Sequence, residues 1–432
     1  MGQQIAFVIH PDNKQDPLPR PPALCLEEAC GLVEAIGVEV AFTDITPLNR
    51  PRAGTFIGPG YADMLKERAE MVEEDHGHPL IVINCSLAPV QQRNLEMITG
   101  CKVIDRTALI LEIFGARAST HAGRLQVELA ALTFQRSRLV RSWTHLERQR
   151  GGGGFLGGPG ERQIELDRRM LMQRVGQIKK ELADVERTRL LQRQNRDRAE
   201  TPTLAFIGYT NAGKSTLFNA ITGAGVLSKD MLFATLDPTM RASQMPSGRK
   251  IVLADTVGFI SQLPTELIEA FKSTLEEVMF ADVLIHVHDA SSPLLREEAE
   301  DVHAVLLDIG MTEDDIAARC LHVLNKMDMV AVEDVPAVMA QIPAGVPLSA
   351  LTGDGVETFF AQLEQRFAED EQSLRVTVAP PDGDARAWLY RFGRITGAEI
   401  DDDGVETLDV TLSLADQSRF RARWPDVPMA DK

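Results

Sequence analysis

The run from Gly208 to Ser215, GYTNAGKS, limits the possible folds of this chain more than any other stretch of its sequence. It matches the pattern G-x-x-x-x-G-K-[ST] and stands between strand-like TLAFI and helical TLFNAIT, the context that a phosphate-binding P-loop requires. In such a loop the backbone N–H groups surround the phosphates, Lys214 neutralises the β and γ oxygens, and Ser215 binds magnesium. Ordinary glycine turns match the pattern by accident, so the motifs that follow decide between the two interpretations.

Two segments after the P-loop are predicted to sense the third phosphate. Asp255-Thr-Val-Gly258 follows strand-like KIVLA, so we expect Asp255 to hold magnesium through water and the Gly258 N–H to meet the γ-phosphate. In FATLDPT, Thr235 is predicted to place its hydroxyl on magnesium and its carbonyl near the attacking water, because loops ordered by the γ-phosphate are common switches. Thr239 is the alternative on spacing alone.

A guanine pocket is predicted by two motifs that end strand-like segments. In Asn325-Lys326-Met327-Asp328, we expect Asp328 to accept hydrogen bonds from guanine N1–H and the amino group, while Lys326 packs along the base. Adenine lacks these donors, so the unpaired carboxylate would penalise it. Ser349-Ala350 is predicted to complete the pocket through backbone N–H groups. Each motif is weak alone, but this order after a P-loop predicts specificity for guanine.

Phe259 follows DTVG, where many small GTPases carry a glutamine that orients the attacking water. Phenylalanine cannot hydrogen-bond water, so we expect a low intrinsic rate of hydrolysis. Asn211 offers a compensation, because an amide oxygen in the P-loop can help to coordinate a potassium ion near the phosphates and stabilise the transition state. The alternative is that Asn211 only stabilises the turn of the loop.

The predicted site therefore combines catalytic, base-binding and ion-binding residues. The expected catalytic residues are Lys214, Thr235, Gly258 and Asn211. Ser215 and Thr235 are the predicted ligands of Mg²⁺, and Asn211 is the predicted ligand of K⁺. The residues expected to contact the nucleotide are Gly208, Tyr209, Thr210, Asn211, Ala212, Gly213, Lys214, Ser215, Thr216, Phe233, Ala234, Thr235, Asp255, Thr256, Val257, Gly258, Asn325, Lys326, Asp328, Ser349 and Ala350.

The pattern along the chain predicts an α/β protein of several domains. Residues 1–120 alternate short apolar runs with amphipathic stretches, which predicts an N-terminal α/β domain with a parallel sheet. Residues 201–370 repeat this alternation around the P-loop and predict a doubly wound GTPase domain. Residues 371–432 predict a small C-terminal α+β domain without a chemical motif.

Residues 121–200 change to a helical period and predict a coiled-coil hairpin. Its tip, GGGGFLGGPG at 151–160, has seven glycines in ten positions, a density that ends both helices. The tip is either a slack connector or a finger, nearly free of side chains, that fits against RNA. The apolar seam residues, at 4-3 spacing, are Leu125, Leu129, Leu132, Leu139, Trp143 and Leu146, then Ile164, Leu171, Val175, Ile178, Leu182 and Val185.

The charge of this hairpin differs from that of the rest of the chain. The net charge of −18 argues at first sight against a nucleic-acid partner. Between Arg136 and Arg198, however, sixteen Lys and Arg residues stand against eight Asp and Glu residues, a local +8 that leaves −26 elsewhere. This asymmetry is typical of a basic arm on an acidic body, although Arg and Lys also simply solvate long helices. The arginines expected to displace counterions from RNA are Arg138, Arg141, Arg148, Arg168 and Arg169.

Composition also limits location and redox chemistry. No apolar run approaches the roughly 18–20 residues that span a bilayer, and no basic leader precedes a long apolar stretch, so we expect a cytoplasmic monomer with at most peripheral membrane association. The cysteines lack metal-ligand spacing and are expected to be reduced thiols. They are Cys25, Cys30, Cys85, Cys101 and Cys320.

These motifs together resemble the HflX family of ribosome-associated GTPases, which is related to the Obg group. The matching stretches are QQRNLE at 91–96, KVIDRTALILEIFGARA at 102–118, GRLQVELA at 123–130, WTHLERQ at 143–149, and then GPGERQIELDRR, GYTNAGKSTLFN, LFATLDPT, DTVGFI and NKMD. The tip has more glycine than the usual family pattern, and the part after Asp370 varies among relatives.

The resemblance implies a role for each unusual feature. Thr235 would be the switch threonine, and Phe259 would place the chain among GTPases with a hydrophobic residue in place of the catalytic glutamine. The hairpin would contact the large ribosomal subunit, with its tip directed into the peptidyl transferase region. We therefore expect a GTPase that binds the large subunit or the 70S ribosome and promotes dissociation under stress, with GTP hydrolysis driving release.

Two other classes of protein remain as alternatives. A tRNA-modification GTPase, or another RNA-linked GTP switch that does not act on ribosomes, would share the P-loop asparagine. A tRNA-modifying enzyme of this kind needs a catalytic cysteine near the end of the chain, and no cysteine follows Cys320. A metabolic P-loop kinase would need neither NKMD nor SA, so comparing GTP with ATP binding would separate it.

Overall fold

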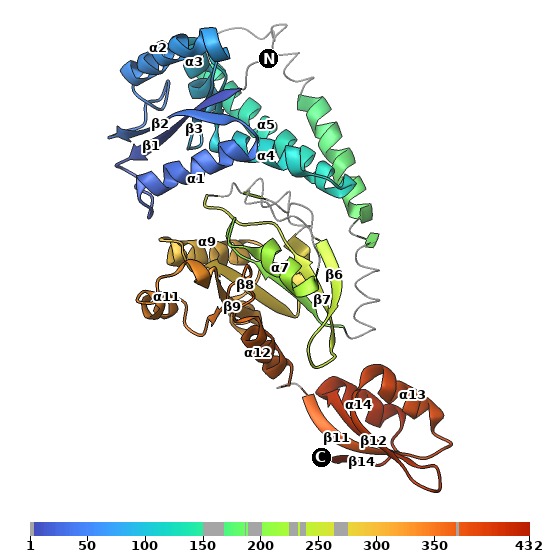
Figure 1. Cartoon of the computed structure of the whole chain (residues 1–432). Coiled ribbons are helices and arrows are strands. Elements are labelled where there is room, and N and C mark those ends of the chain that lie inside the picture. Colours follow the sequence, from blue (N-terminus) through green and yellow to red (C-terminus); the bar gives the residue numbers. More distant parts are fainter. Residues whose placement is uncertain are drawn as a thin grey trace.

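The computed structural model contains three β-sheets in chain order, joined by helices (Figure 1). The residues described are 4–149, 168–185, 187–188, 201–223, 232–233, 239–262, 275–368 and 371–432. Within these residues no helix is both long and apolar enough to cross a membrane. Each sheet lies inside one of the predicted ranges 1–120, 201–370 and 371–432, while the domain boundaries themselves stay predictions.

The first sheet is parallel, in the order β2-β1-β3-β4. Its strands are β1 (Ile5–Asn13), β2 (Glu39–Leu48), β3 (Leu80–Ile83) and β4 (Val103–Asp105), and its helices are α1 (Pro22–Ala35), α2 (Pro59–His76), α3 (Pro89–Thr99) and α4 (Arg106–Arg117). Three of these helices begin with proline, whose fixed φ suits the first helical turn and whose missing N–H costs nothing there. Helices α2 and α3 pack on one face of the sheet, and α1 and α4 pack on the other.

The helical hairpin follows as α5 (His121–Gln149) and a second helix over residues 168–185. His121 lies beside Glu181 and Arg174 beside Glu128, so the two helices run antiparallel. The tip at 151–160 lies outside the described residues. The seam residues that pack together are Leu125, Leu129, Leu132, Val175, Ile178 and Leu182, which is the pairing that the 4-3 spacing predicts.

Arg138 on α5 differs from its predicted role in binding RNA. Its guanidinium donates to Asp105 Oδ2 at 3.1 Å, to Leu87 O at 3.4 Å and to Gln92, and its side chain is 18% exposed. The assignment of Arg138 to the RNA-binding surface is therefore wrong. A pattern of charge cannot distinguish an exposed arginine from one that pairs with the preceding sheet, because the pairing depends on tertiary packing.

The second sheet carries the P-loop and has the order β10-β9-β8-β5-β7-β6. Its strands are β5 (Thr203–Ile207), β6 (Thr239–Gln244), β7 (Lys250–Asp255), β8 (Val283–Asp289), β9 (Cys320–Asn325) and β10 (Val346–Pro347). All pair in parallel except β6, an edge strand antiparallel to β7. Helices α7 (Lys214–Thr222) and α12 (Val356–Ala368) cover one face, and α9 (Leu295–Asp308) and α10 (Glu313–Arg319) cover the other. Two short elements, η1 (Met327–Met329) and α11 (Val335–Gln341), follow β9.

The sequence does not predict β6. Its residues, TMRASQ, are mostly polar and mostly exposed, so they lack the apolar alternation by which the other strands are recognised. The strand forms because β7 offers an open edge for antiparallel pairing.

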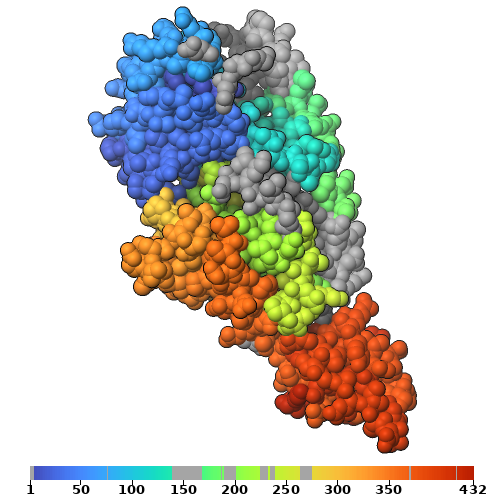
Figure 2. All heavy atoms as spheres, in the orientation of Figure 1, coloured from blue at the N-terminus to red at the C-terminus, as the bar shows by residue number. Residues whose placement is uncertain are grey.

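The third sheet is antiparallel, in the order β12-β13-β11-β14. Its elements are β11 (Glu371–Val378), α13 (Gly383–Phe392), β12 (Arg394–Ile400), β13 (Glu406–Ser413), α14 (Leu414–Arg423) and β14 (Met429–Asp431). This part projects from one end of the molecule, as the space-filling view shows (Figure 2). Arg249 pairs with Glu371 where it meets the second sheet.

The first and second sheets share one apolar core. Helices α1 and α4 face the second sheet, and buried residues from both sides belong to a single cluster (Figure 1). Phe114 of α4 packs edge-on against Phe233, with the ring centroids 4.7 Å apart. The nucleotide segments of the second sheet are therefore in direct contact with the first.

Candidate nucleotide-binding site

The P-loop passes from β5 into α7, close to two other strands. Gly208 (φ 145°) and Gly213 (φ 88°) adopt backbone conformations that favour glycine. An added Cβ would lie 2.2 Å from Val287 O at Gly208 and 2.2 Å from Asn325 Nδ2 at Gly213. The two motif glycines therefore let the loop lie directly against β8 and β9.

Lys214 extends across its own loop. Its Nζ donates to Gly208 O at 3.0 Å and to Tyr209 O at 2.8 Å, and the residue is buried. Burial lowers the pKa of Lys214 to about 8, against the opposing effect of Asp255. A Cβ added to Gly258 would lie 3.2 Å from Lys214 Nζ. The P-loop lysine and the DTVG segment are thus side by side, as two elements that share a phosphate must be.

Ser215 and Asp255 bring together two oxygen ligands. Ser215 Oγ donates to Asp255 Oδ2 at 2.7 Å, and Asp255, at the end of β7, is buried. A hydroxyl beside a carboxylate is a hard oxygen donor set of the type that Mg²⁺ prefers. The residues present therefore fit the predicted magnesium ion, with Ser215 as direct ligand and Asp255 acting through water.

The segment after Gly258 pairs with the P-loop through its backbone. Phe259 N donates to Gly208 O at 3.1 Å, and Thr210 N donates to Phe259 O at 2.7 Å. The Phe259 side chain is 2% exposed and belongs to the apolar cluster shared by the first two sheets. A ring in this position is part of the core, which agrees with the argument that Phe259 orients no water.

Asn325 connects three parts of the predicted base pocket. Its side chain is 2% exposed, and its Nδ2 donates to Ala212 O in the P-loop at 2.9 Å. Its Oδ1 accepts from Ala350 N at the same distance. The turn after β10 is closed by Ser349 N donating to Asp354 O at 2.9 Å. The P-loop, the end of β9 and the turn after β10 are therefore held together by one amide.

Lys326 and Asp328 follow β9, next to Asn325. Lys326 Nζ pairs with Asp289 Oδ2 at 2.7 Å, and Asp289 Oδ1 accepts from Ser291 N at 3.0 Å. Asp328 is exposed, in the short helix that follows. Asp289 thus positions the lysine that is predicted to pack along the base. Asp289 was not among the predicted residues, although its place at the carboxyl end of β8 is a signal that could have identified it.

Other predicted residues are less closely defined. Asn211 is exposed in the P-loop with φ 61°, and its role in binding K⁺ stays a prediction. Ala234 and Thr235 lie outside the described residues. The alternative switch residue, Thr239, is exposed at the start of β6, opposite Asp255 in the register. The remaining predicted residues lie in or beside the same loops, namely Thr210, Ala212, Thr216, Thr256, Val257 and Ala350.

Phe233 has a different place from the one expected. It has φ 55° and is 2% exposed, and its ring packs against Phe114. The side chain therefore serves the interface with α4 rather than the nucleotide site. The sequence could not show this, because the partner ring comes from a distant helix of the first sheet.

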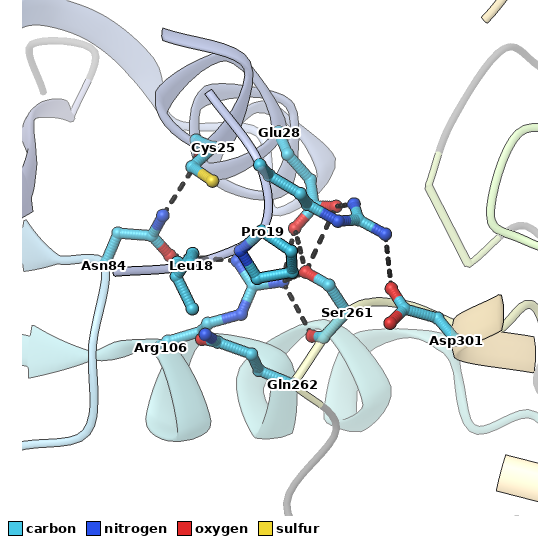
Figure 3. A pocket seen from close by; sticks show the side chains of 10 residues that line it. Leu18, Pro19, Cys25, Glu28, Asn84, Arg106, Ser261, Gln262 and Asp301 are labelled. Carbon is cyan, nitrogen blue, oxygen red and sulfur yellow. Dashed lines mark hydrogen bonds and ion pairs between the residues drawn. The ribbon is translucent and has the colours of Figure 1, made fainter. Parts of the chain in front are cut away.

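A polar cluster at the interface joins the nucleotide loops to α1 and α4 (Figure 3). Glu28 of α1 accepts hydrogen bonds from Tyr209 of the P-loop and from Ser261 Oγ at 3.0 Å, and it pairs with Arg106 of α4. Arg106 Nη2 also donates to Ser261 O at 3.0 Å, and Ser261 N donates to Tyr209 Oη at 2.7 Å. Arg20 donates to Tyr209 Oη at 2.9 Å. Arg20, Glu28, Arg106 and Ser261 line a cavity of about 60 Å³.

The side chains of this cluster are largely buried, and their charged groups interact with one another. The side chains of Arg20 and Arg106 are each 6% exposed, that of Glu28 is 14% exposed, and Arg20 also pairs with Asp301. Burial and then the Glu28 carboxylate raise the pKa of Tyr209 well above its usual range. Apart from Tyr209, the residues of this cluster were not among the predicted site residues. Its members come from distant segments, and no local pattern marks them.

Comparison with protein families gives four matches in chain order. A GTP-binding GTPase N-terminal model matches residues 24–115, and a GTP-binding GTPase middle-region model matches residues 117–196. A 50S ribosome-binding GTPase model matches residues 203–326, and an HflX C-terminal domain model matches residues 337–432.

Individual proteins resemble the chain over most of its length. A GTPase HflX of Magnetococcus marinus is 50% identical over 369 residues, covering 85% of this chain and 82% of its own. The GTPase HflX of Escherichia coli is 43% identical over 404 residues, covering 93% and 92%. A solved GTP-binding protein of Sulfolobus solfataricus in complex with GDP is 23% identical, with a TM-score of 0.44, and covers 84% of this chain and 99% of that one.

Proposed function

Because this chain belongs to the HflX family of GTPases, we propose that its GTP-bound form binds the large ribosomal subunit and promotes dissociation of 70S ribosomes. Hydrolysis of GTP would then drive release. The chain is a GTPase with a ribosome-binding GTPase domain. The observation that supports binding and dissociation of ribosomes is the basic helical hairpin. It follows the first sheet, whose helices α1 and α4 contact the nucleotide-binding loops.

The proposed chemistry uses the residues that the site brings together. Lys214 and the backbone of the P-loop bind the phosphates, and Asp328 and Lys326 bind guanine. Mg²⁺ would be held by Ser215 directly and by Asp255 through water, where it neutralises charge on the phosphates. Thr235 is proposed as the further magnesium ligand. Since Phe259 is buried, water must be oriented by other groups, and Asn211 with K⁺ is our proposal for part of that role.

The hairpin supplies the proposed surface for RNA. Arg168 and Arg169, at the start of the described part of its second helix, are exposed, whereas Arg138 is tied to Asp105. Exposed arginines displace counterions from phosphates, and this favours binding at low salt. RNA contact is therefore proposed for the exposed side of the hairpin that carries Arg168 and Arg169, rather than for the side on which Arg138 is paired with the first sheet.

The polar cluster offers a physical link between nucleotide and hairpin. Ser261 lies two residues after Phe259 and contacts both Glu28 and Arg106. If this segment moves with the γ-phosphate, those contacts must change. Such a change is linked to the nucleotide energetically, because a buried charge that loses its partner strongly destabilises the protein. Helix α4, which carries Arg106, leads into α5, the first helix of the hairpin. A change in the contacts of Arg106 would therefore be transmitted to the hairpin through α4.

Deletion of the tip tests the proposal. Replacing residues 151–160 by a short turn should leave GTP and GDP affinity unchanged, because the nucleotide loops lie in the second sheet. The variant should lose splitting of 70S ribosomes and any stimulation of hydrolysis by ribosomes. Sedimentation of ribosomes in sucrose gradients with a non-hydrolysable GTP analogue measures the first effect. A variant that splits ribosomes at the wild-type rate would show that the tip is only a connector.

Charge reversal gives a matched control for the arm. Arg168→Glu combined with Arg169→Glu should weaken binding to the large subunit and reduce its dependence on salt by about one unit of slope per lost phosphate contact. Arg296→Glu changes an exposed arginine on α9 that pairs with Glu300, and should leave binding unchanged. A loss in the control that is about half of that in the double variant, in proportion to the charge removed, would point to net charge alone. Binding to tRNA without binding to ribosomes would favour the alternative function.

A further inference from the structure

A cluster of histidines lies in the second sheet, away from the phosphate-binding loop. His286 and His288 alternate along β8, and Cys320 and His322 alternate along the neighbouring β9. Since the strands pair in parallel with His286 opposite His322, all four side chains lie on the same face of the sheet. His303 of α9, which covers this face, lies close enough to influence His286 and His322. The cluster thus gathers four of the nine histidines of the chain.

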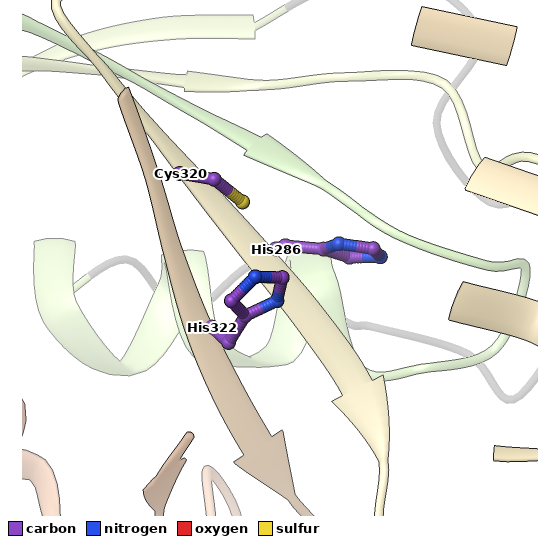
Figure 4. Close-up of side chains that lie close together, drawn as sticks. All are labelled: His286, Cys320 and His322. Carbon is purple, nitrogen blue, oxygen red and sulfur yellow. The ribbon is translucent and has the colours of Figure 1, made fainter. Parts of the chain in front are cut away.

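Three of these residues converge on one point. The ligand atoms of His286, Cys320 and His322 all lie within 4.8 Å of one another, the only group of its kind among the described residues (Figure 4). His286 is 4% exposed, whereas Cys320 and His322 are half-buried, so two of the three residues are partly accessible to solvent. We propose that His286, Cys320 and His322 form a zinc site whose fourth position is open to water or to an added ligand.

The distances fit a site that tightens when the metal binds. Tetrahedral zinc with the usual Zn–N and Zn–S bonds places its ligand atoms roughly 3.3–3.6 Å apart. The separations within 4.8 Å therefore need adjustments of about 1 Å, which side-chain rotations supply. Cys320 and His322 have the room to move because they are only half-buried, while the packed His286 fixes the position of the site.

His288 acts as a positioning residue for this site. Its Nε2 lies 3.0 Å from His322 Nδ1, so one of the two rings donates a hydrogen bond to the other. When His322 Nδ1–H is the donor of this bond, Nε2 of His322 keeps its lone pair for the metal, which is how neighbouring groups usually orient a ligating histidine. The ring of His288 also packs against that of His286, with ring centroids 3.8 Å apart and planes tilted by 35°, and thereby restricts the orientation of a second ligand.

The donor set favours zinc over the hard cation of the nucleotide site. Imidazole and thiolate are soft ligands that bind Zn²⁺ and related transition metals, whereas Mg²⁺ requires oxygen. Burial raises the pKa of the Cys320 thiol to about 12, so zinc would have to displace its proton on binding. The competing explanation is a group of neutral histidines in the core that binds no metal. The two explanations predict different numbers of zinc ions bound per chain.

A metal at this site would link β8 and β9, the strands whose ends carry residues of the predicted base pocket. Three residues beyond the ligands, β8 ends at Asp289 and β9 ends at Asn325, and these residues pair with Lys326 and Ala212. A bond between the strands at His286 and His322 would hold these ends in register. Zinc is therefore expected to stabilise the second sheet, whether or not the chain acts on ribosomes.

Metal binding to the full chain, without an affinity tag, tests the proposal. After equilibration with Zn²⁺ and gel filtration, elemental analysis should find about one zinc per chain. Cobalt in its place should give the intense visible bands of tetrahedral Co²⁺ and a thiolate charge-transfer band. Cys320→Ser and His322→Asn should weaken zinc binding at least about 100-fold, and His288→Asn about 10- to 100-fold. The matched controls Cys30→Ser and His78→Asn, outside the cluster, should bind as the wild type does.

A measurement on the unchanged protein guards against variants that misfold. Zinc should protect Cys320, but not the similarly half-buried Cys30, from alkylation, as followed by mass spectrometry of peptides. GDP binding by each variant reports whether the second sheet has folded. Absence of retained zinc in the wild type, binding that survives Cys320→Ser in a folded protein, or equal alkylation with and without zinc would each overturn the proposal.

Discussion

Replacement of Asn325 by alanine is expected to loosen the base pocket from within. The substitution removes both hydrogen bonds of one buried amide, to Ala212 O and from Ala350 N, each 2.9 Å long. A buried polar group that loses its partner costs about 1–3 kcal/mol, so the two backbone groups together cost about 2–6 kcal/mol. At roughly 1.4 kcal/mol for each factor of ten, the lower end of this range already corresponds to a loss of about 30-fold.

The lost free energy lowers either the affinity for nucleotide or the local stability of the base pocket, so both quantities must be measured. Titration with a fluorescent GDP analogue gives the affinity, and hydrogen exchange of the peptide that contains Ala350 gives the local stability. Asn94→Ala is the control, because Asn94 donates a single exposed hydrogen bond, to Gly54 O, and should change neither measurement. Affinity within twofold of the wild type, together with unchanged exchange at Ala350, would refute the role assigned to Asn325.

Three further predictions concern the base, the cation and the interface. Asp328→Asn should weaken GTP and favour xanthosine nucleotides, because the amide offers a donor where xanthine has a carbonyl; unchanged GTP affinity would contradict the base-pocket assignment. Hydrolysis should be faster in K⁺ than in Na⁺ at equal ionic strength, and Asn211→Ala should remove the difference with little loss of affinity, whereas equal wild-type rates would leave Asn211 a turn residue. Glu28→Gln should destabilise the interface by about 3 kcal/mol, because it leaves the buried Arg106 without its charged partner, and hydrogen exchange at residues 259–262 should rise. The control Glu70→Gln, at an exposed pair, should have almost no effect there.

The sequence predicted the local parts of this site well. The P-loop, the DTVG segment and NKMD are each short runs whose chemistry depends on neighbours in the chain, and the family they indicate is confirmed by the relatives. The parallel sheets and the hairpin are confirmed as elements of the fold, since apolar periodicity reports directly which face is buried. The roles of the individual residues in binding nucleotide stay predictions.

The parts that the sequence did not show depend on contacts between distant segments. Glu28 meets Ser261 across 233 positions of the chain, and Arg106 meets Glu28 across 78. Arg138 fits the pattern of a basic arm equally well whether it faces RNA or Asp105. The histidines of β8 and the Cys320 and His322 pair of β9 become a cluster only when the two strands are placed in register. Spacing along one segment carries none of this information.

Phe259 is buried in the interface between the first and second sheets, and this position restricts how its segment can move. In a GTPase with glutamine at this position, the side chain turns to the nucleotide and leaves the rest of the segment free to move. Here the ring is packed in a core shared with α1 and α4, and its backbone pairs with Gly208 and Thr210 of the P-loop. A segment held on both sides cannot follow the γ-phosphate without repacking the core or breaking the contacts of Ser261. A change at the γ-phosphate is therefore expected to reach the first sheet, and through α4 the hairpin that follows it.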